Sequence, residues 1–225
     1  MTALEVGVER LRHVYGAEEE AVVALDDLTF RLPAGSTTAI MGPSGSGKST
    51  LTTILAGLQR PTSGRVLIGD ADLAALSEVE LMRLRARELA VTVQRPDRNL
   101  LGYGTVLDNV RFAQRGVARV DRGRLPAPLE VLREVGIAHL VDQRADGLSG
   151  GERQRLALAV GLATAPRVLL ADEPTSQLDD RNRDALVDLL CGLRGRITVI
   201  VVTHDDRLGE RFDRRIVLAD GRAVG

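Results

Sequence analysis

The chain has 225 residues, 44% of them hydrophobic, which suits one large domain or one domain with an inserted subdomain. Its formal net charge is −1, so no overall field favours nucleic acid or an anionic membrane, and no nucleic-acid partner is expected. The single cysteine excludes an intrachain disulfide and fits a reducing, cytoplasmic location. No apolar run approaches the roughly 20 residues that cross a bilayer, and Glu5, Glu9 and Arg10 interrupt any N-terminal signal pattern.

Short apolar segments predict several strands in the first third of the chain, most of them bounded by glycine or proline turns. The first segment, 4–11, alternates loosely and is predicted to be an edge strand, and the others are 22–25, 28–32, 38–41 and 65–68. Ser77 and Glu80 have the spacing of a capping box, which predicts a helix from here to about Arg87.

Residues 42–49 read Gly-Pro-Ser-Gly-Ser-Gly-Lys-Ser and lie between a predicted strand and a predicted helix, the context that makes this pattern a P-loop. Its glycines let successive backbone N–H groups point at phosphate oxygens, and the helix start adds further donors and the positive end of its dipole. Lys48 is expected to reach the β- and γ-phosphates, and the Ser49 hydroxyl to ligate Mg²⁺. The predicted nucleotide-binding residues here are Gly42, Pro43, Ser44, Gly45, Ser46, Gly47, Lys48, Ser49 and Thr50.

Lys48 is the only lysine among 30 basic residues, the remainder being arginine. A planar guanidinium cannot replace a compact ammonium on a flexible stem inside a tight phosphate cradle. The composition therefore supports a specific role for Lys48 in the P-loop.

The second half of the chain alternates between predicted strands and helices. Apolar residues recur at helical spacing in 105–113 and 128–135, so residues 95–145 are predicted to be a helical insertion. Strands are predicted at 89–93, 167–171, 197–202 and 215–218, and helices at 155–164 and 179–193. This alternation, with continuous apolar central strands, predicts an α/β layered fold around a parallel sheet.

Gly42, Gln94, Asp172 and His204 each follow the end of a predicted strand. Because chemistry in parallel sheets collects at the carboxyl ends of the strands, these residues are expected to share one site. The sequence therefore predicts that the P-loop and the other strand ends act on the same nucleotide.

The chemistry of these side chains suggests their roles. Asp172 is predicted to hold Mg²⁺ opposite the Ser49 hydroxyl, as the strand-end carboxylate of P-loop enzymes does. Glu173 is predicted to orient and deprotonate the water that attacks the γ-phosphate. His204 is predicted to contact the γ-phosphate, and Gln94 to ligate Mg²⁺ or the attacking water.

Two further features point to the nucleotide. Tyr15, one of two tyrosines, is either a residue that stacks on adenine or an ordinary partly buried aromatic. Ser149-Gly150-Gly151 forms a second glycine turn at a helix start without a lysine, which predicts a second anion site. Because one P-loop needs no such partner for the same nucleotide, this site is predicted to serve a nucleotide held by another subunit.

Residues 148–154, Leu-Ser-Gly-Gly-Glu-Arg-Gln, match a more specific signature, and with it the chain resembles the ATP-binding subunits of ABC transporters over essentially its whole length. The matching motifs, in order, are the A-loop at Tyr15, the Walker A motif at the P-loop, the Q-loop at Gln94, the signature, the Walker B motif at 172–173, the D-loop at 176–179 and the H-loop at His204.

The resemblance implies one ATPase domain over residues 1–225. Its P-loop NTPase core has a parallel central sheet, with an N-terminal antiparallel β subdomain and an inserted helical subdomain at about 95–145 and on to 165. It also implies a head-to-tail homodimer or heterodimer that holds two ATP, with Mg²⁺, between the P-loop of one subunit and the signature of the other. Glu173 is then the catalytic base, and the residues offered to the partner's ATP are Ser149, Gly150, Gly151, Glu152 and Asp179.

The resemblance further implies transmembrane permease subunits on a separate chain, with this subunit peripheral on the cytoplasmic face of the membrane. Four segments look like the lipoprotein-release and macrolide-export branch, which implies an exporter or a mechanotransmission system: 61–64, 72–73 with 76–77, 99–101 and 170–176. An importer subunit, or an ATPase that signals through a membrane partner to cell-envelope enzymes, remains an alternative. A GTPase is excluded, because its guanine-recognition motif needs a lysine that this chain does not have to spare.

Overall fold

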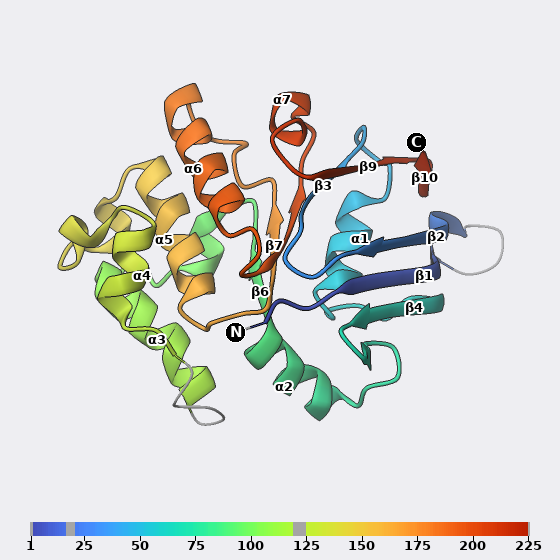
Figure 1. The fold of residues 1–225 in the computed structure, drawn as a ribbon, viewed down its shortest axis with the longest axis horizontal. Coiled ribbons are helices and arrows are strands. Elements are labelled where there is room, and N and C mark those ends of the chain that lie inside the picture. The colour runs from blue at the N-terminus through green and yellow to red at the C-terminus, as the bar shows by residue number, and fades with distance from the viewer. Residues whose placement is uncertain (1, 17–20, 119–124, 225) are drawn as a thin grey trace.

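In the computed structural model, which describes residues 2–16, 21–118 and 125–224, the strands form two sheets that lie beside each other (Figure 1). The larger sheet has the strand order β10-β9-β3-β8-β7-β6, and the smaller has the order β2-β1-β4-β5. Helices α3 (Val106–Ala118), α4 (Pro128–Glu134), α5 (Gly150–Leu162) and α6 (Asp180–Gly192) form a group on the other side of the larger sheet, whereas α1 (Lys48–Leu55) lies on the side of the smaller sheet (Figure 1). Residues 119–124 of the predicted helical insertion lie outside the described residues.

The larger sheet is parallel except for the pairing of β10 with β9. Its strands are β3 (Thr37–Met41), β6 (Leu89–Thr92), β7 (Val168–Asp172), β8 (Thr198–Val202), β9 (Arg214–Ala219) and β10 (Arg222–Val224). Every residue of β3 and β8 is buried, because both faces of these central strands are covered. The prediction that 215–218 is the last strand was wrong, since β10 follows it across a tight turn.

The smaller sheet is antiparallel and contains β1 (Val6–Tyr15), β2 (Val22–Leu32), β4 (Ser63–Ile68) and β5 (Ala71–Asp72). The predicted edge strand at 4–11 was wrong in its position, because β1 pairs with β2 on one side and β4 on the other. The two strands predicted at 22–25 and 28–32 are one strand. Its pairing with β1 shifts register near Asp27, which has a φ of 49°, so a β-bulge produced the apparent break.

The helices are α1 (Lys48–Leu55), α2 (Glu78–Glu88), α3 (Val106–Ala118), α4 (Pro128–Glu134), α5 (Gly150–Leu162), α6 (Asp180–Gly192) and α7 (Asp206–Gly209). The predicted capping box of α2 is confirmed, with Ser77 N–H donating to Glu80 Oε2 at 2.9 Å and Glu80 N–H donating to Ser77 Oγ. None of the helices in the described ranges is long and apolar enough to cross a bilayer.

The larger sheet divides the hydrophobic core in two, because successive side chains of a strand point to opposite faces. Leu169 and Val199 pack into a cluster with α3, α4, α5 and α6. Leu170 and Ile200, the next residues along the same strands, pack into a second cluster with α1 and the antiparallel sheet. The predicted fold, a parallel core with an antiparallel β subdomain and a helical insertion, is therefore confirmed.

Two leucines of α4 test how strongly this helix is held to the core. Leu132 is fully buried, whereas Leu129 on the same helix is 42% exposed. We expect Leu132→Ala to lower the free energy of unfolding by about 2–5 kcal/mol, because it leaves a cavity. The matched change Leu129→Ala should cost less than about 1 kcal/mol. Urea titrations of both variants measure the difference, and equal losses would contradict the burial assigned to α4.

Candidate functional site

A pocket of about 630 Å³ lies at the carboxyl ends of the parallel strands. The first residue of α1 contributes Lys48, and the segment after β6 contributes Gln94. Strands β7 and β8 lead to Asp172, Glu173 and His204. Of the four residues expected to share one site, Gln94, Asp172 and His204 line this pocket, whereas Gly42 does not. The full lining is Val22, Val23, Ala24, Ser44, Gly45, Gly47, Lys48, Ser49, Thr50, Gln94, Asp172, Glu173, Val202 and His204.

The glycine-rich loop supplies one wall of this pocket. Gly47 has a φ of 98° and is the N-cap of α1, so no side chain caps the N–H groups of the first helical turn. No acidic side chain lies in that turn either. A helix start with free donors and no nearby carboxylate of its own is a ready anion site.

The Lys48 ammonium bends back over this loop. Nζ donates to the carbonyl oxygens of Gly42 and Pro43, each at 2.7 Å. These bonds keep the only lysine of the chain at the pocket instead of in solvent. A bound anion can therefore replace these carbonyl oxygens as the acceptor of the ammonium protons.

Glu173 is held in place by hydrogen bonds at both carboxylate oxygens. His204 Nδ1 lies 2.7 Å from Oε1, and the Thr203 hydroxyl donates to Oε2 at 3.4 Å. The backbone of Glu173 has a φ of 46°, a left-handed conformation that costs energy for a residue with a side chain. Glu173 therefore combines a strained backbone with a carboxylate that is hydrogen-bonded to His204 at the pocket wall.

Asp172 lies beside Glu173 and is half-buried. Burial raises the pKa of the Asp172 carboxyl, the charge of Glu173 raises it further, and Lys48 acts in the opposite direction. Both main effects disfavour the ionised form. Lys48 balances only part of the negative charge of an ionised Asp172, so this carboxylate would stabilise a cation bound beside it.

The position of Tyr15 is more specific than the sequence indicated. It ends β1 outside the pocket lining, 43% exposed, and its hydroxyl donates to Gln59 Oε1 at 3.1 Å and lies 3.3 Å from Thr50 Oγ1. Val22 and Val23, which sequence reasoning missed, line the pocket while remaining 63% and 44% exposed. Two valines in a predicted strand carry no local signal that they line a nucleotide pocket.

The signature residues do not line this pocket. Ser149 is the N-cap of α5, and Glu152 completes a capping box whose hydrogen bonds from Ser149 lower the pKa of the Glu152 carboxyl. Asp179 caps α6 and accepts from the backbone and side-chain nitrogens of Asn182 at 2.9 and 2.7 Å. The side chain of Asn182 also packs against Gly151, so the signature and Asp179 lie together, apart from Lys48.

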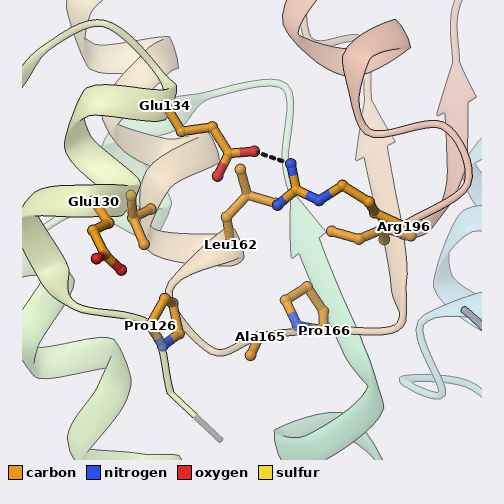
Figure 2. Close-up of a pocket in the computed structure, with 9 residues that line it drawn as sticks. Pro126, Glu130, Glu134, Leu162, Ala165, Pro166 and Arg196 are labelled. Carbon is orange, nitrogen blue, oxygen red and sulfur yellow. Dashed lines mark hydrogen bonds and ion pairs between the residues drawn. The ribbon is translucent and has the colours of Figure 1, made fainter. Parts of the chain in front are cut away.

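A second pocket, of about 330 Å³, lies at the amino ends of β7 and β8 (Figure 2). Its walls come from α4, the end of α5 and the segments before these strands, and Arg196 pairs with Glu134 at 2.7 Å across it (Figure 2). Glu130 adds another carboxylate to this wall. With two acidic groups, one of which is already paired with Arg196, this pocket is a poor match for phosphates.

Comparisons with known proteins show the family of this chain. The family model described as ABC transporter matches residues 25–176. The lipoprotein-releasing system ATP-binding protein LolD of Anaeromyxobacter dehalogenans is 42% identical over 97% of this chain and 92% of its own length. The methionine import ATP-binding protein MetN of Bradyrhizobium diazoefficiens is 39% identical over 90% of this chain and 58% of its own length.

Solved structures show the same fold. The dimeric structure of MJ0796, a bacterial ABC transporter cassette, superposes with a TM-score of 0.85 at 32% identity, covering 98% of this chain and 97% of that one. A dimeric post-hydrolysis state of the same cassette, bound to ADP and Pi, superposes with a TM-score of 0.84 at 33% identity over the same shares. The chain therefore belongs to the ABC transporter family and is an ATP-hydrolysing subunit of that family.

Proposed function

We propose that this chain binds Mg²⁺–ATP in the larger pocket, hydrolyses it with Glu173 as the base, and uses the cycle to drive a separate membrane permease. The observation that carries the proposal is the convergence of Lys48, Asp172, Glu173 and His204 in one pocket. In this proposal, residues 1–225 act as one ATPase domain, with the helical subdomain at about 95–165.

The P-loop residues 42–50 would hold the ATP phosphates through backbone N–H groups and Lys48. Ser49, Asp172 and Gln94 are the proposed holders of Mg²⁺, since all three line the pocket and offer oxygen atoms. The raised pKa of the Asp172 carboxyl supports this assignment, because an incompletely balanced carboxylate fits a cation. When bound, Mg²⁺ would neutralise charge on the phosphates.

Glu173 is the proposed general base. Its carboxylate would accept a proton from the attacking water, and the hydrogen bond to His204 would keep it in one orientation. His204 and Gln94 are proposed to contact the γ-phosphate and the water, respectively. A base held before the substrate arrives needs no reorganisation during the reaction.

The site needs a second subunit in this proposal, because the signature lies away from the pocket of its own chain. The residues offered to the partner's ATP are Ser149, Gly150, Gly151, Glu152 and Asp179. The dimeric MJ0796 structures support a dimer of such cassettes. A homodimer and a heterodimer with a second ATP-binding subunit are both compatible with these surfaces.

We assign this subunit to the cytoplasmic face of the membrane, in an exporter or mechanotransmission system of the lipoprotein-releasing kind. The segments noted in the sequence and the similarity to LolD support this branch. Import is the second candidate, favoured by the 39% identity to MetN.

A groove next to Gln94 is the proposed contact for the permease. It has a volume of about 360 Å³ and is lined by Asp97, Leu100, Gly102, Ala145, Asp146 and Arg153. Arg153 pairs with Asp97 at 3.5 Å within it, and exposed Tyr103 follows Gly102. Gln94 lines the nucleotide pocket and the segment after it leads to Asp97 in the groove, so this segment is the proposed connection between the two sites.

Glu173→Gln tests the base. We expect ATP turnover to fall by about 10²- to 10⁴-fold while ATP binding persists, since the amide cannot accept the proton. Without hydrolysis, the ATP-bound protein should elute at the mass of a dimer. Turnover assays and size-exclusion chromatography with light scattering measure both effects. Turnover at the wild-type rate would remove Glu173 from the mechanism.

Asp172→Asn tests the buried charge. The folded state carries the cost of an ionised carboxyl whose pKa is raised, so nucleotide-free Asp172→Asn should unfold at a higher temperature than the wild type. Mg²⁺-dependent ATP hydrolysis should fall on the order of 100-fold. Asp184→Asn, at an exposed position of α6, is the matched control and should change neither quantity. A lower unfolding temperature for Asp172→Asn would contradict the electrostatic argument.

Gly102→Leu tests the groove. A side chain at Gly102 meets only Asp146 Cβ, at 3.9 Å, so leucine fits the fold but fills the groove. In a tagged Glu173→Gln background, Gly102→Leu should no longer co-purify with the permease from detergent-solubilised membranes in the presence of ATP. In the protein that keeps Glu173, Gly102→Leu should retain the basal ATPase activity. Gly116→Leu, placed in open space on α3, is the control. Retention of the same membrane protein by Gly102→Leu would disprove this docking site.

A further inference from the structure

A small hydrogen-bonded cluster behind the nucleotide pocket joins β1 to the turn after α1. His13 and Tyr15 are two residues apart on β1, so both side chains point to the same face of the sheet. Gln59 follows α1 and reaches both of them. Sequence reasoning assigned no role to Gln59, because its two partners on β1 lie more than 40 positions away.

The tyrosine ring is tethered at its hydroxyl. The Tyr15 hydroxyl donates to Gln59 Oε1 at 3.1 Å and lies 3.3 Å from the Thr50 hydroxyl, which follows Ser49 on α1. Since the ring is 43% exposed, packing alone leaves it considerable freedom. The two hydroxyl contacts therefore connect the orientation of the ring directly to the P-loop helix.

His13 supports Gln59 from the interior. Its side chain is buried, and Nε2 lies 2.7 Å from Gln59 Nε2. An amide NH₂ can only donate, so Nε2 accepts and the ring proton lies on Nδ1. Nδ1 is buried and has no hydrogen-bond partner among the described residues. The side chain of His13 is therefore oriented by its contacts with Gln59 and Tyr15.

The imidazole also contacts the tyrosine. The two ring centroids are 4.6 Å apart with an interplanar angle of 80°, an edge-to-face arrangement. The turn carrying Gln59 is itself fixed, because Leu58 N–H donates to Thr53 O and Arg85 donates to Gly57 O. His13 and Gln59 thus restrain the ring from one side and at its tip.

We propose that Gln59, oriented by His13, is a positioning residue for the nucleotide base: it fixes the Tyr15 ring in the orientation that receives adenine. This inference rests on the proposed ATP site and on the stacking role of Tyr15. A ring fixed before binding loses less conformational freedom when the base stacks on it, so affinity is higher. The tyrosine hydroxyl meets the P-loop helix only at the Thr50 side chain, so loss of the bond to Gln59 leaves the backbone N–H groups and Lys48 in place for the triphosphate.

A double-mutant cycle with Gln59→Leu and Tyr15→Phe tests the tether. Each change removes the bond between the tyrosine hydroxyl and the amide, so each should weaken ATP binding by about threefold to tenfold. The double variant should bind ATP no more weakly than Tyr15→Phe alone, because that change already removes the bond to Gln59 together with the contact to Thr50. Calorimetric titration with ATP measures the affinities. Tripolyphosphate, which has no base, should bind all four proteins equally, and this binding also verifies the fold.

Additive losses for ATP, or equal losses for ATP and tripolyphosphate, would overturn the positioning role. Tyr15→Ala separates this inference from the site assignment. A Tyr15→Ala protein with unchanged ATP affinity would show that the ring does not receive the base. If instead wild-type protein bound neither ATP nor tripolyphosphate, the proposed function itself would fail. Reduced ATP affinity in Tyr15→Ala together with wild-type affinity in Gln59→Leu would disprove only the inference about Gln59.

The composition offers a spectroscopic check. The chain has no tryptophan and two tyrosines, and Tyr103 is 76% exposed. In a Tyr103→Phe background, tyrosine emission therefore reports Tyr15 alone. ATP should change this emission, whereas tripolyphosphate should not. Adding Gln59→Leu should alter the emission before nucleotide is added, and an unchanged spectrum would contradict the tether.

Discussion

The close approach of three backbone segments at the P-loop is the constraint on which the rest of the structure depends. A side chain at Gly42 would overlap the carbonyl oxygen of Leu218, and one at Gly47 would overlap that of Ala24. Both glycines have positive φ values, 151° and 98°, so other residues would be strained there as well. The P-loop is therefore held between β9 of the parallel sheet and β2 of the antiparallel sheet. The same glycines that free N–H groups for phosphate allow the two sheets to meet.

Much of the site was predictable from the sequence, because its determinants are local. Apolar strands end at Asp172 and His204, and parallel pairing of β7 with β8 brings their ends together. The capping box predicted at Ser77 needs only a residue three positions later, and it forms. Where a motif and its structural context lie within about ten residues, sequence pattern and fold agree.

Other features depended on distant partners and were not predictable in the same way. The alternation of 4–11 shows a strand but not its neighbours, so β1 was taken for an edge strand although it lies between β2 and β4. The bulge at Asp27 interrupts the pattern of one strand and resembles the gap between two. Gln59 carries no motif, and its significance comes only from the approach of β1 to the end of α1.

The charges and the backbone strain at the pocket lower the stability of the nucleotide-free protein. Asp172 and Glu173 place two carboxyl groups side by side, Glu173 adopts a strained backbone, and Lys48 offsets only part of the charge at Asp172. The adjacent carboxyl groups and the strained backbone disfavour the nucleotide-free fold, and a bound cation would relieve the repulsion between the carboxyl groups. In the proposed dimer, the signature of the partner adds donors that this chain cannot supply to its own pocket. Binding energy from nucleotide and metal would then be available to close two subunits, which is what a subunit that drives a permease requires.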